Sequence, residues 1–399
     1  MSKRHSGEGT VRQRDNGRWE VRLRYDDPIS GERKRASFYG ATAKEARAEM
    51  KKAVERLNEG KPVRDASASV AEVVKDWRTK TLVASSRKET TKGLYAGLLK
   101  SHVESSPIAG KRLDRFRASD VDALIVELRG KVKLINGELG EDGRPIKVVV
   151  RALSESTVEK IIRVLRLALD GAVRDQLLAR NPVDASERVT VPRAEVSHLP
   201  AVDVARVLAE ARGTRYLPIL TLIATTGLRK GEALALKWAD VDFDKGTLRV
   251  RGTLSRVGGK LVVTEPKTEK SRRNIPLRGT AAIVLRNHRQ EQREERIRAA
   301  NIWTDTGHVF TTETGRPMDP RNVLRAITTA AKKAGMTNVN VHTLRHSAAT
   351  YWLENGVHLR AVSDLLGHSS TRITGDVYAH TSDDAANRAM DVLGEALGL

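Results

Sequence analysis

The apolar residues of this 399-residue chain change their spacing along its length. Near the N-terminus, Trp19, Val21, Leu23 and Tyr25 alternate with charged residues, and this period of two is typical of a half-buried strand. Farther along, apolar residues recur at the three- and four-residue intervals of a helix with one buried face: Val158, Ile161, Ile162, Leu165 and Leu169. Both periods, in separate regions of one long chain, predict an α+β protein of two or three domains.

Residues 1–64 are predicted to form a small three-stranded sheet backed by one helix. Asp15-Asn16-Gly17 is a hairpin signal before the strand at 19–25, and a third strand is expected at 32–38. Thr42 and Glu45 fit a capping box that opens a helix running to about Leu57.

Arginines recur on adjacent strands of this predicted sheet. Arg12 and Arg14 share one face of their strand, and Arg22 and Arg24 share one face of the next. A two- or three-stranded ribbon fits the major groove of DNA, so these arginines are candidate DNA contacts. The alternative is that they only make an exposed sheet face soluble.

Residues 66–182 are predicted to be a mostly helical domain. Ser69 with Glu72 and Ser156 with Glu159 fit capping boxes, Ser119 is expected to open a third helix, and Asn181-Pro182 to end the last one. Residues 131–153 are predicted to form an inserted loop or hairpin. Cationic side chains beside the 158–169 apolar stripe are candidate phosphate contacts: Lys160, Arg163 and Arg166.

Residues 196–399 are predicted to be a mostly α domain with a small antiparallel sheet. Helices are expected at 202–211, 216–225, 232–236, 280–300, 320–334 and 343–355, and short strands at 247–251, 260–264 and 271–275.

The charge of the chain points to a polyanionic partner. The formal net charge is +21, and lysine plus arginine outnumber aspartate plus glutamate in each of residues 1–65, 66–195 and 196–399. Nucleic acid is the first candidate partner, and a solvated basic surface is the alternative. The absence of cysteine excludes disulfides and thiolate chemistry. No apolar run approaches the about 20 residues of a membrane span, so a soluble, cytoplasmic protein is expected.

Four short segments of the C-terminal half carry candidate chemistry. In Thr226–Glu232, Gly227 permits a tight turn and Arg229 stands where a helix begins, an arrangement suited to phosphate. Lys267 follows a β-like run, at what is expected to be a hairpin tip. The other two segments are His342-Thr343-Leu344-Arg345-His346 and the stretch from Leu366 to His380 that contains His368 and Tyr378.

The third segment also raises the possibility of zinc. His342 and His346 have the four-residue spacing of two zinc ligands on a helix, but Thr343 stands where a metalloprotease would carry its general-base glutamate. No acidic cluster suited to a divalent metal is apparent either. We therefore expect no metal and no other cofactor.

Together the four segments resemble the tyrosine recombinase, or phage integrase, family, over roughly Leu199 to His380. The motif positions of the family fall on Arg229, Lys267, His342, Arg345, His368 and Tyr378, with Glu232 as a supporting acidic residue. The two preceding regions are similar, more loosely, to the arm-type DNA-binding and helical core-binding domains of such integrases.

The resemblance implies that Tyr378 attacks a DNA phosphodiester, forming a 3′-phosphotyrosyl link and releasing a 5′-hydroxyl. Arg229 and Arg345 would bind the phosphate oxygens, His342 would act as general base and Lys267 as general acid. His368 would bind the phosphate or position the tyrosine. The religation step needs no ATP because the covalent link conserves the energy of the broken bond.

The expected function is therefore that of a site-specific integrase of a phage or another mobile element. Expected partners are core and arm DNA sites, further copies of the chain in a tetramer, a DNA-bending host factor and a directionality factor. Two alternatives are a type IB topoisomerase, which shares the same residues, and a catalytically silent DNA-binding regulator.

Overall fold

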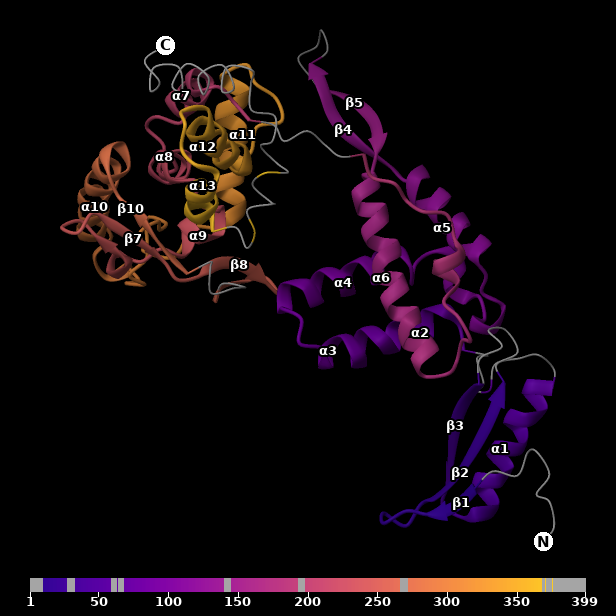
Figure 1. The fold of residues 1–399 in the computed structure, drawn as a ribbon. Helices are drawn as coiled ribbons and strands as arrows, with labels where there is room; N and C mark the ends of the chain where they lie inside the picture. Colours follow the sequence, from indigo (N-terminus) through magenta and orange to yellow (C-terminus); the bar gives the residue numbers. More distant parts are fainter. Residues whose placement is uncertain are drawn as a thin grey trace, which may run out of the picture. The chain divides into compact units, whose positions relative to one another are not determined.

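The computed structural model describes residues 10–26, 33–58, 63, 68–139, 145–192, 198–265, 272–367, 370 and 375. The chain divides into two compact units, Met1–Arg193 and Ala194–Leu399 (Figure 1). The first unit holds two separate hydrophobic clusters, one in the N-terminal sheet and one among the helices that follow. The division into three domains, at 1–64, 66–182 and 196–399, stays a prediction.

The N-terminal part is an antiparallel sheet with one helix against it (Figure 1). It comprises β1 (Thr10–Gln13), β2 (Trp19–Asp26), β3 (Arg33–Gly40) and α1 (Ala43–Asn58). The predicted alternation holds, because Val21 and Leu23 are buried while Arg24 is exposed. The predicted cap of α1 forms in part: Glu45 N donates to Thr42 Oγ1 at 3.2 Å, but the Glu45 carboxylate accepts from Ala41 N.

The second part of this unit is helical and encloses its own core. Its elements are α2 (Val70–Asp76), the π-helix η1 (Trp77–Thr81), α3 (Leu82–Ala84), α4 (Glu89–His102), the short 3-10 helices η2 (Pro107–Gly110) and η3 (Leu113–Arg115), α5 (Ala118–Gly130), β4 (Val132–Leu139), β5 (Pro145–Arg151), α6 (Glu155–Arg174) and η4 (Pro182–Ala185). The apolar stripe at 158–169 is the buried face of α6, as its periodicity predicts. The 131–153 segment is an antiparallel hairpin.

Three helix boundaries predicted for this part are wrong. Ser154, not Ser156, caps α6, because its hydroxyl accepts from Thr157 N at 3.3 Å and so leaves Ser156 within the first turn. Helix α5 begins at Ala118, where the Asp120 carboxylate accepts from Arg117 N at 2.8 Å. Helix α6 ends at Arg174, well before Asn181, whose side chain instead caps η4.

The second unit is a helical body with small antiparallel sheets. Its elements are α7 (Ala201–Glu210), α8 (Leu217–Thr226), α9 (Lys230–Ala235), η5 (Trp238–Asp240), β6 (Val241–Asp242), β7 (Thr247–Val250), β8 (Thr253–Val257), β9 (Lys260–Thr264), β10 (Arg273–Pro276), α10 (Gly279–Ala299), η7 (Ala300–Ile302), α11 (Pro320–Lys333), α12 (Val341–Glu354) and α13 (Leu359–Leu366). Helix α8 is apolar on nearly every side, and it packs against α10 and α12 in the centre (Figure 1).

Two details of this unit differ from the sequence prediction. Strand β9 pairs with β8, whereas β10 pairs with β7, so β9 and β10 do not pair with each other. Lys267 stands between them in the sequence, outside the described residues. Helix α13 also went unpredicted. It has only eight residues, and its Val362 and Leu366 join Ala349 in a small cluster of their own.

Candidate functional site

The turn between α8 and α9 presents Arg229. Gly227 ends α8 in the left-handed conformation, with φ +64°, and an added Cβ would lie 2.8 Å from Leu366 Cδ2. Arg229 is the N-cap of α9: its backbone N–H donates to Glu232 Oε2 at 3.0 Å, and its Nη1 donates to Glu232 Oε1 at 2.8 Å. The Arg229 side chain is 36% exposed, so part of its guanidinium stays open to solvent.

Glu232 is a buried carboxylate shared by two arginines. Its second partner is Arg273 on β10, whose Nη2 donates to Glu232 Oε2 at 2.9 Å and whose side chain is 7% exposed. Burial by itself raises the pKa of Glu232, but the charges and hydrogen bonds of Arg273 and then Arg229 outweigh it and hold the pKa below its ordinary value. Glu232 is therefore ionised at neutral pH.

Arg273 is the residue that sequence reasoning missed at this site. The signal available was the period of two along β10, which puts Arg273 on the same face as the buried Ile275. A buried arginine needs a carboxylate partner, and Glu232 was already a candidate residue. That Arg273 would lie beside Glu232 could not be read from the sequence, because 41 positions separate the two residues.

The first turn of α12 carries His342 and Arg345. The Asn340 side chain caps this helix by accepting from His342 N at 2.8 Å and Thr343 N at 3.3 Å. Arg345 is 3% exposed and donates to Gly227 O at 2.6 Å and to Leu366 O at 2.8 Å. Arg345 thereby links the 342–346 segment directly to the 226–232 segment.

Three arginines converge on the carboxyl end of α13. Arg273 Nε donates to Leu365 O at 2.7 Å, and Leu366 O accepts from Arg345 and, at 3.4 Å, from Arg229 Nη1. Arg229 Nη2 also lies 3.4 Å from Gly367 O. Gly367 has φ +64°, and a Cβ there would lie 2.7 Å from Arg273 Nη1. The last carbonyls of a helix carry partial negative charge, which explains this clustering of cations.

The histidines of α12 are held in their neutral form. Partial burial, followed by the charges of Arg345, Lys230 and Arg229, lowers the pKa of His342. Burial, followed by His342 and Arg345, lowers the pKa of His346 to about 4. A neutral imidazole can accept a proton at pH 7, as the role assigned to His342 requires.

The described structure brings together Arg229, Glu232, His342 and Arg345 from two separate segments of the sequence. The predicted residues Lys267, His368 and Tyr378 lie outside the described residues. No group of three or more histidine, aspartate or glutamate side chains that could hold a metal occurs within the described ranges.

The predicted basic face of the N-terminal sheet gathers around one carboxylate. Glu20, which is 1% exposed, accepts from Arg12 Nε at 2.7 Å, Arg14 Nε at 3.1 Å and Arg22 Nε at 3.1 Å. Hydrogen bonds from Arg14 and then Arg22 hold the pKa of Glu20 far below its ordinary value. One carboxylate thus orders three guanidinium groups and neutralises part of their charge.

Arg24 behaves differently from the other arginines of this face. It stands directly opposite Arg35 in the β2–β3 register, and both side chains are exposed. Neither forms an ion pair with a carboxylate of the described residues. Like charges directly opposite one another destabilise a sheet, so this end of the face favours an anionic partner.

The three predicted cations of α6 are also on the surface. Arg163 and Arg166 are exposed and pair with Glu159 at 3.4 Å and Asp184 at 3.2 Å, respectively. Lys160 is half-buried. Exposed pairs of this kind are weak, so both arginines stay available to exchange a carboxylate for a phosphate.

Comparison with known proteins identifies the second unit. Residues 198–385 match the model of the phage integrase family. The second unit therefore carries a phage integrase family domain, and the chain has tyrosine recombinase homologues. The recombinase is 28% identical over 380 residues to a "Tyrosine recombinase XerC-like" protein of Caldanaerobacter subterraneus subsp. tengcongensis, an alignment that covers 90% of this chain and 92% of the relative.

Two solved structures share the fold of the recombinase. The Tn1549 transposon integrase in complex with circular intermediate DNA is 21% identical with a TM-score of 0.62, and the alignment covers 81% of this chain and 99% of that one. The lambda integrase tetramer bound to a Holliday junction is 18% identical with a TM-score of 0.55, and the alignment covers 92% of this chain and 94% of that one.

As a site-specific recombinase the chain is an enzyme. The topoisomerase and silent-regulator alternatives receive no support from these comparisons. No helix among the described residues is long and apolar enough to cross a membrane.

Proposed function

We propose that the recombinase is the integrase of a phage or another mobile element and cleaves DNA through a 3′-phosphotyrosyl link to Tyr378. The observation that supports this most directly is the Leu366 carbonyl oxygen, which accepts hydrogen bonds from both Arg345 and Arg229. Two guanidinium groups that share one oxygen acceptor are close enough to share a phosphate. A guanidinium carries five N–H donors and can donate two parallel hydrogen bonds to phosphate oxygens.

In this proposal His342 and Lys267 each carry out one proton transfer. His342, neutral at pH 7, accepts the proton of the Tyr378 hydroxyl. Lys267 protonates the departing 5′-oxygen, and His368 binds the phosphate or positions Tyr378. Glu232 and Arg273 keep Arg229 and the end of α13 in place. Loss of one preorganised donor to the phosphate should cost about 3–4 kcal/mol of barrier.

We also propose that the first unit recognises the DNA sites. The α6 cations would contact phosphates of the core site, and the N-terminal sheet would contact arm sites through Arg24 and the arginines around Glu20. The relative in the lambda system forms a tetramer on a Holliday junction, which supports a tetramer of this chain on DNA. A DNA-bending host factor and a directionality factor complete the proposed assembly.

The test uses a nicked duplex that carries the direct repeat flanking the gene, on which cleavage traps the covalent intermediate. The unsubstituted recombinase should give a slow-migrating adduct on a denaturing gel, and Tyr378→Phe should bind the duplex equally well without forming an adduct. Tyr351→Phe, at an exposed tyrosine of α12, is the matched control and should form the adduct. An adduct that persists in Tyr378→Phe would contradict the assignment of the nucleophile.

A plasmid assay addresses the topoisomerase alternative. Recombination products are expected only from plasmids that carry the repeat. Relaxation of any supercoiled plasmid, without site-dependent products, would contradict the integrase proposal.

A further inference from the structure

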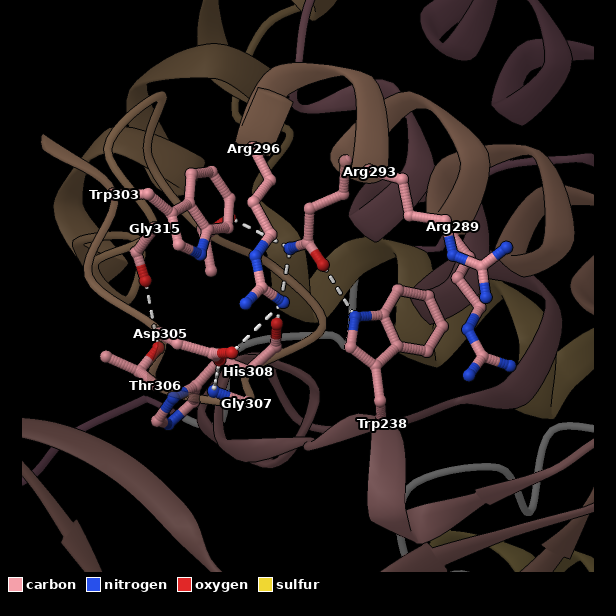
Figure 2. Close-up of a pocket in the computed structure, with 12 residues that line it drawn as sticks. Trp238, Arg289, Arg293, Arg296, Trp303, Asp305, Thr306, Gly307, His308 and Gly315 are labelled. Atoms are coloured by element: carbon pink, nitrogen blue, oxygen red, sulfur yellow. Dashed lines mark hydrogen bonds and ion pairs between the residues drawn. The ribbon is translucent and has the colours of Figure 1, made fainter. Parts of the chain in front are cut away.

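A pocket of about 340 Å³ opens beside α10 in the second unit (Figure 2). Trp238 of η5 forms one wall, Arg289, Arg293 and Arg296 of α10 form another, and the 303–315 segment closes the remainder. The pocket shares no residue with the proposed catalytic set. Its volume lies within the range of small-ligand sites.

Hydrogen bonds of a buried glutamine hold the floor of this pocket in one arrangement. Gln292, which is 8% exposed, donates through Nε2 to Val309 O and Thr311 Oγ1, each at 2.9 Å. Its Oε1 accepts from Trp238 Nε1 at 2.6 Å. The floor and the Trp238 wall are therefore preformed and need no reorganisation on binding.

The arginines of the pocket belong to a basic face of α10. At about 100° per residue, the four arginines 286, 289, 293 and 296 fall within about 80° of the helix circumference. The glutamates 291, 294 and 295 lie on the opposite side. This segregation concentrates positive charge at the pocket.

Few carboxylates neutralise these arginines. Arg296 lies 3.1 Å from Asp305, and it alone of the four forms an ion pair with a described carboxylate. Arg289 instead lies over the Trp238 ring at 5.5 Å. Arg286 lies over the Phe243 ring at 5.2 Å. A ring face orients a guanidinium without cancelling its charge, so these cations remain available for an anion.

A buried histidine of the pocket is also unsatisfied. His308 is 8% exposed, and its ring nitrogens form no hydrogen bond of normal geometry with the described residues, although the Thr306 backbone raises its pKa slightly. Burial and then the charge of Lys237 lower the pKa of His308, so the ring is neutral at pH 7 and keeps one N–H donor. A buried donor without a partner costs free energy, so the chain's own groups do not fully satisfy this wall of the pocket.

We propose that this pocket and the arginine face above it bind the phosphate of a nucleotide, at a place separate from the catalytic site. Several guanidinium groups on one face match a phosphate, because each can donate two parallel hydrogen bonds to its oxygens. The phosphate belongs either to a DNA strand, which would hold more of the substrate against the recombinase, or to a free nucleotide. The proposal does not depend on the role of Tyr378.

The test compares two double variants with the same change in charge. In Arg289→Gln/Arg293→Gln the pocket face loses two cations. In Arg298→Gln/Arg212→Gln two exposed arginines outside this face are lost instead. Binding of a duplex without the attachment site is measured from 50 to 300 mM salt, and binding of AMP and of inorganic phosphate by calorimetry.

If the phosphate belongs to DNA, the pocket variant should lower the slope of log K against log salt by about 1.8, two contacts at about 0.9 each, and the control should not. If it belongs to a free nucleotide, AMP should bind the unsubstituted chain and the control, and at least tenfold more weakly to the pocket variant. Identical behaviour of the two double variants in both measurements would overturn the proposal.

A third variant separates lost charge from lost packing. Arg289→Lys/Arg293→Lys keeps both charges and should restore most of the salt slope. A lysine variant whose salt slope is as low as that of the glutamine variant would indicate that the arginines do not act through their charge, and would overturn the assignment to a DNA phosphate. The adduct test with Tyr378 is a separate measurement. Failure of the pocket proposal can therefore be distinguished from failure of the proposed recombinase function.

Discussion

At the scale of single residues, the arrangement of the site depends on the buried ion pair between Glu232 and Arg273. Glu232 is 3% exposed and bonds both to Arg273 and to Arg229, the motif arginine of the α8–α9 turn. Removal of one member of a buried pair leaves an uncompensated charge, which is more costly than the pair is stabilising.

Glu232→Gln is therefore expected to destabilise the second unit by on the order of 3 kcal/mol. The variant should also slow adduct formation, because Arg229 would lose the carboxylate that orients it. Urea denaturation measures the first effect and gel analysis of the nicked duplex the second. Glu210→Gln, at an exposed position of α7, is the control and should change neither. Unchanged stability of Glu232→Gln would contradict the structural role of this pair.

His342 leads to a prediction about pH. Its pKa lies below the ordinary histidine value, so the base form persists as the pH falls through about 6.5 and adduct formation should decline only at lower pH. His342→Gln should slow the adduct by a factor of about 10² to 10⁴ and remove that decline. Rates between pH 5 and 8 test both statements; an acid decline that survives in the variant would assign the base to another residue.

At the scale of elements, the turn from α8 to α9 decides whether helices α8, α9, α12 and α13 meet. Gly227 takes a positive φ, its carbonyl accepts from Arg345, and the space beside its Cα is filled by Leu366 and Trp352. A side chain at this position would be strained and would also push α13 away.

Gly227→Ala and Gly213→Ala form a matched pair, because both glycines have positive φ, +64° and +74°, but nothing lies within 4 Å of a Cβ at Gly213. Gly213→Ala should cost about 1–2 kcal/mol of left-handed strain. Gly227→Ala should cost about 1–3 kcal/mol more through overpacking and should reduce adduct formation. Equal costs in the two variants would contradict the close packing described for Gly227.

At the scale of the whole molecule, the second unit should lose stability in acid. Burial is the largest cause of the lowered pKa of His288, His308, His342 and His346. Well above pH 6.5, neither the folded nor the unfolded chain binds a proton at these groups. Below it the unfolded chain takes up protons first, so stability falls, by up to about 1.4 kcal/mol per pH unit for each proton involved.

Denaturation in urea at pH 7.5 and 5 tests this dependence, and NMR titration resolves the individual groups. The imidazole of His346 should titrate with a midpoint near pH 4. A midpoint at pH 6 or above would contradict its burial among cations, and equal stability at the two pH values would contradict the linkage as a whole.

Local sequence signals determined most of the elements and half of the candidate site. The strand at 19–25, the stripe of α6 and the helices α7, α8, α10, α11 and α12 follow from side-chain periods, which reflect burial of one face. They failed where the residue that fits a capping box is not the cap, as at Ser156, two residues after the true cap Ser154. They also failed at the short elements β8 and α13. Arg229, Glu232, His342 and Arg345 were identifiable because their residue types and intervals are read directly along the chain.

The tertiary structure alone decided how those residues are held. Arg273 bonds to Glu232, 41 positions away in the sequence, and Arg345 bonds to Gly227, 118 positions away. No local period encodes either separation. The same holds for Glu20, which collects three arginines that the alternation pattern had presented as free cations. A sequence shows which charged residues share one face of a strand or helix. The partners of these charges depend on which elements pack together, and this packing follows from burial of the whole core.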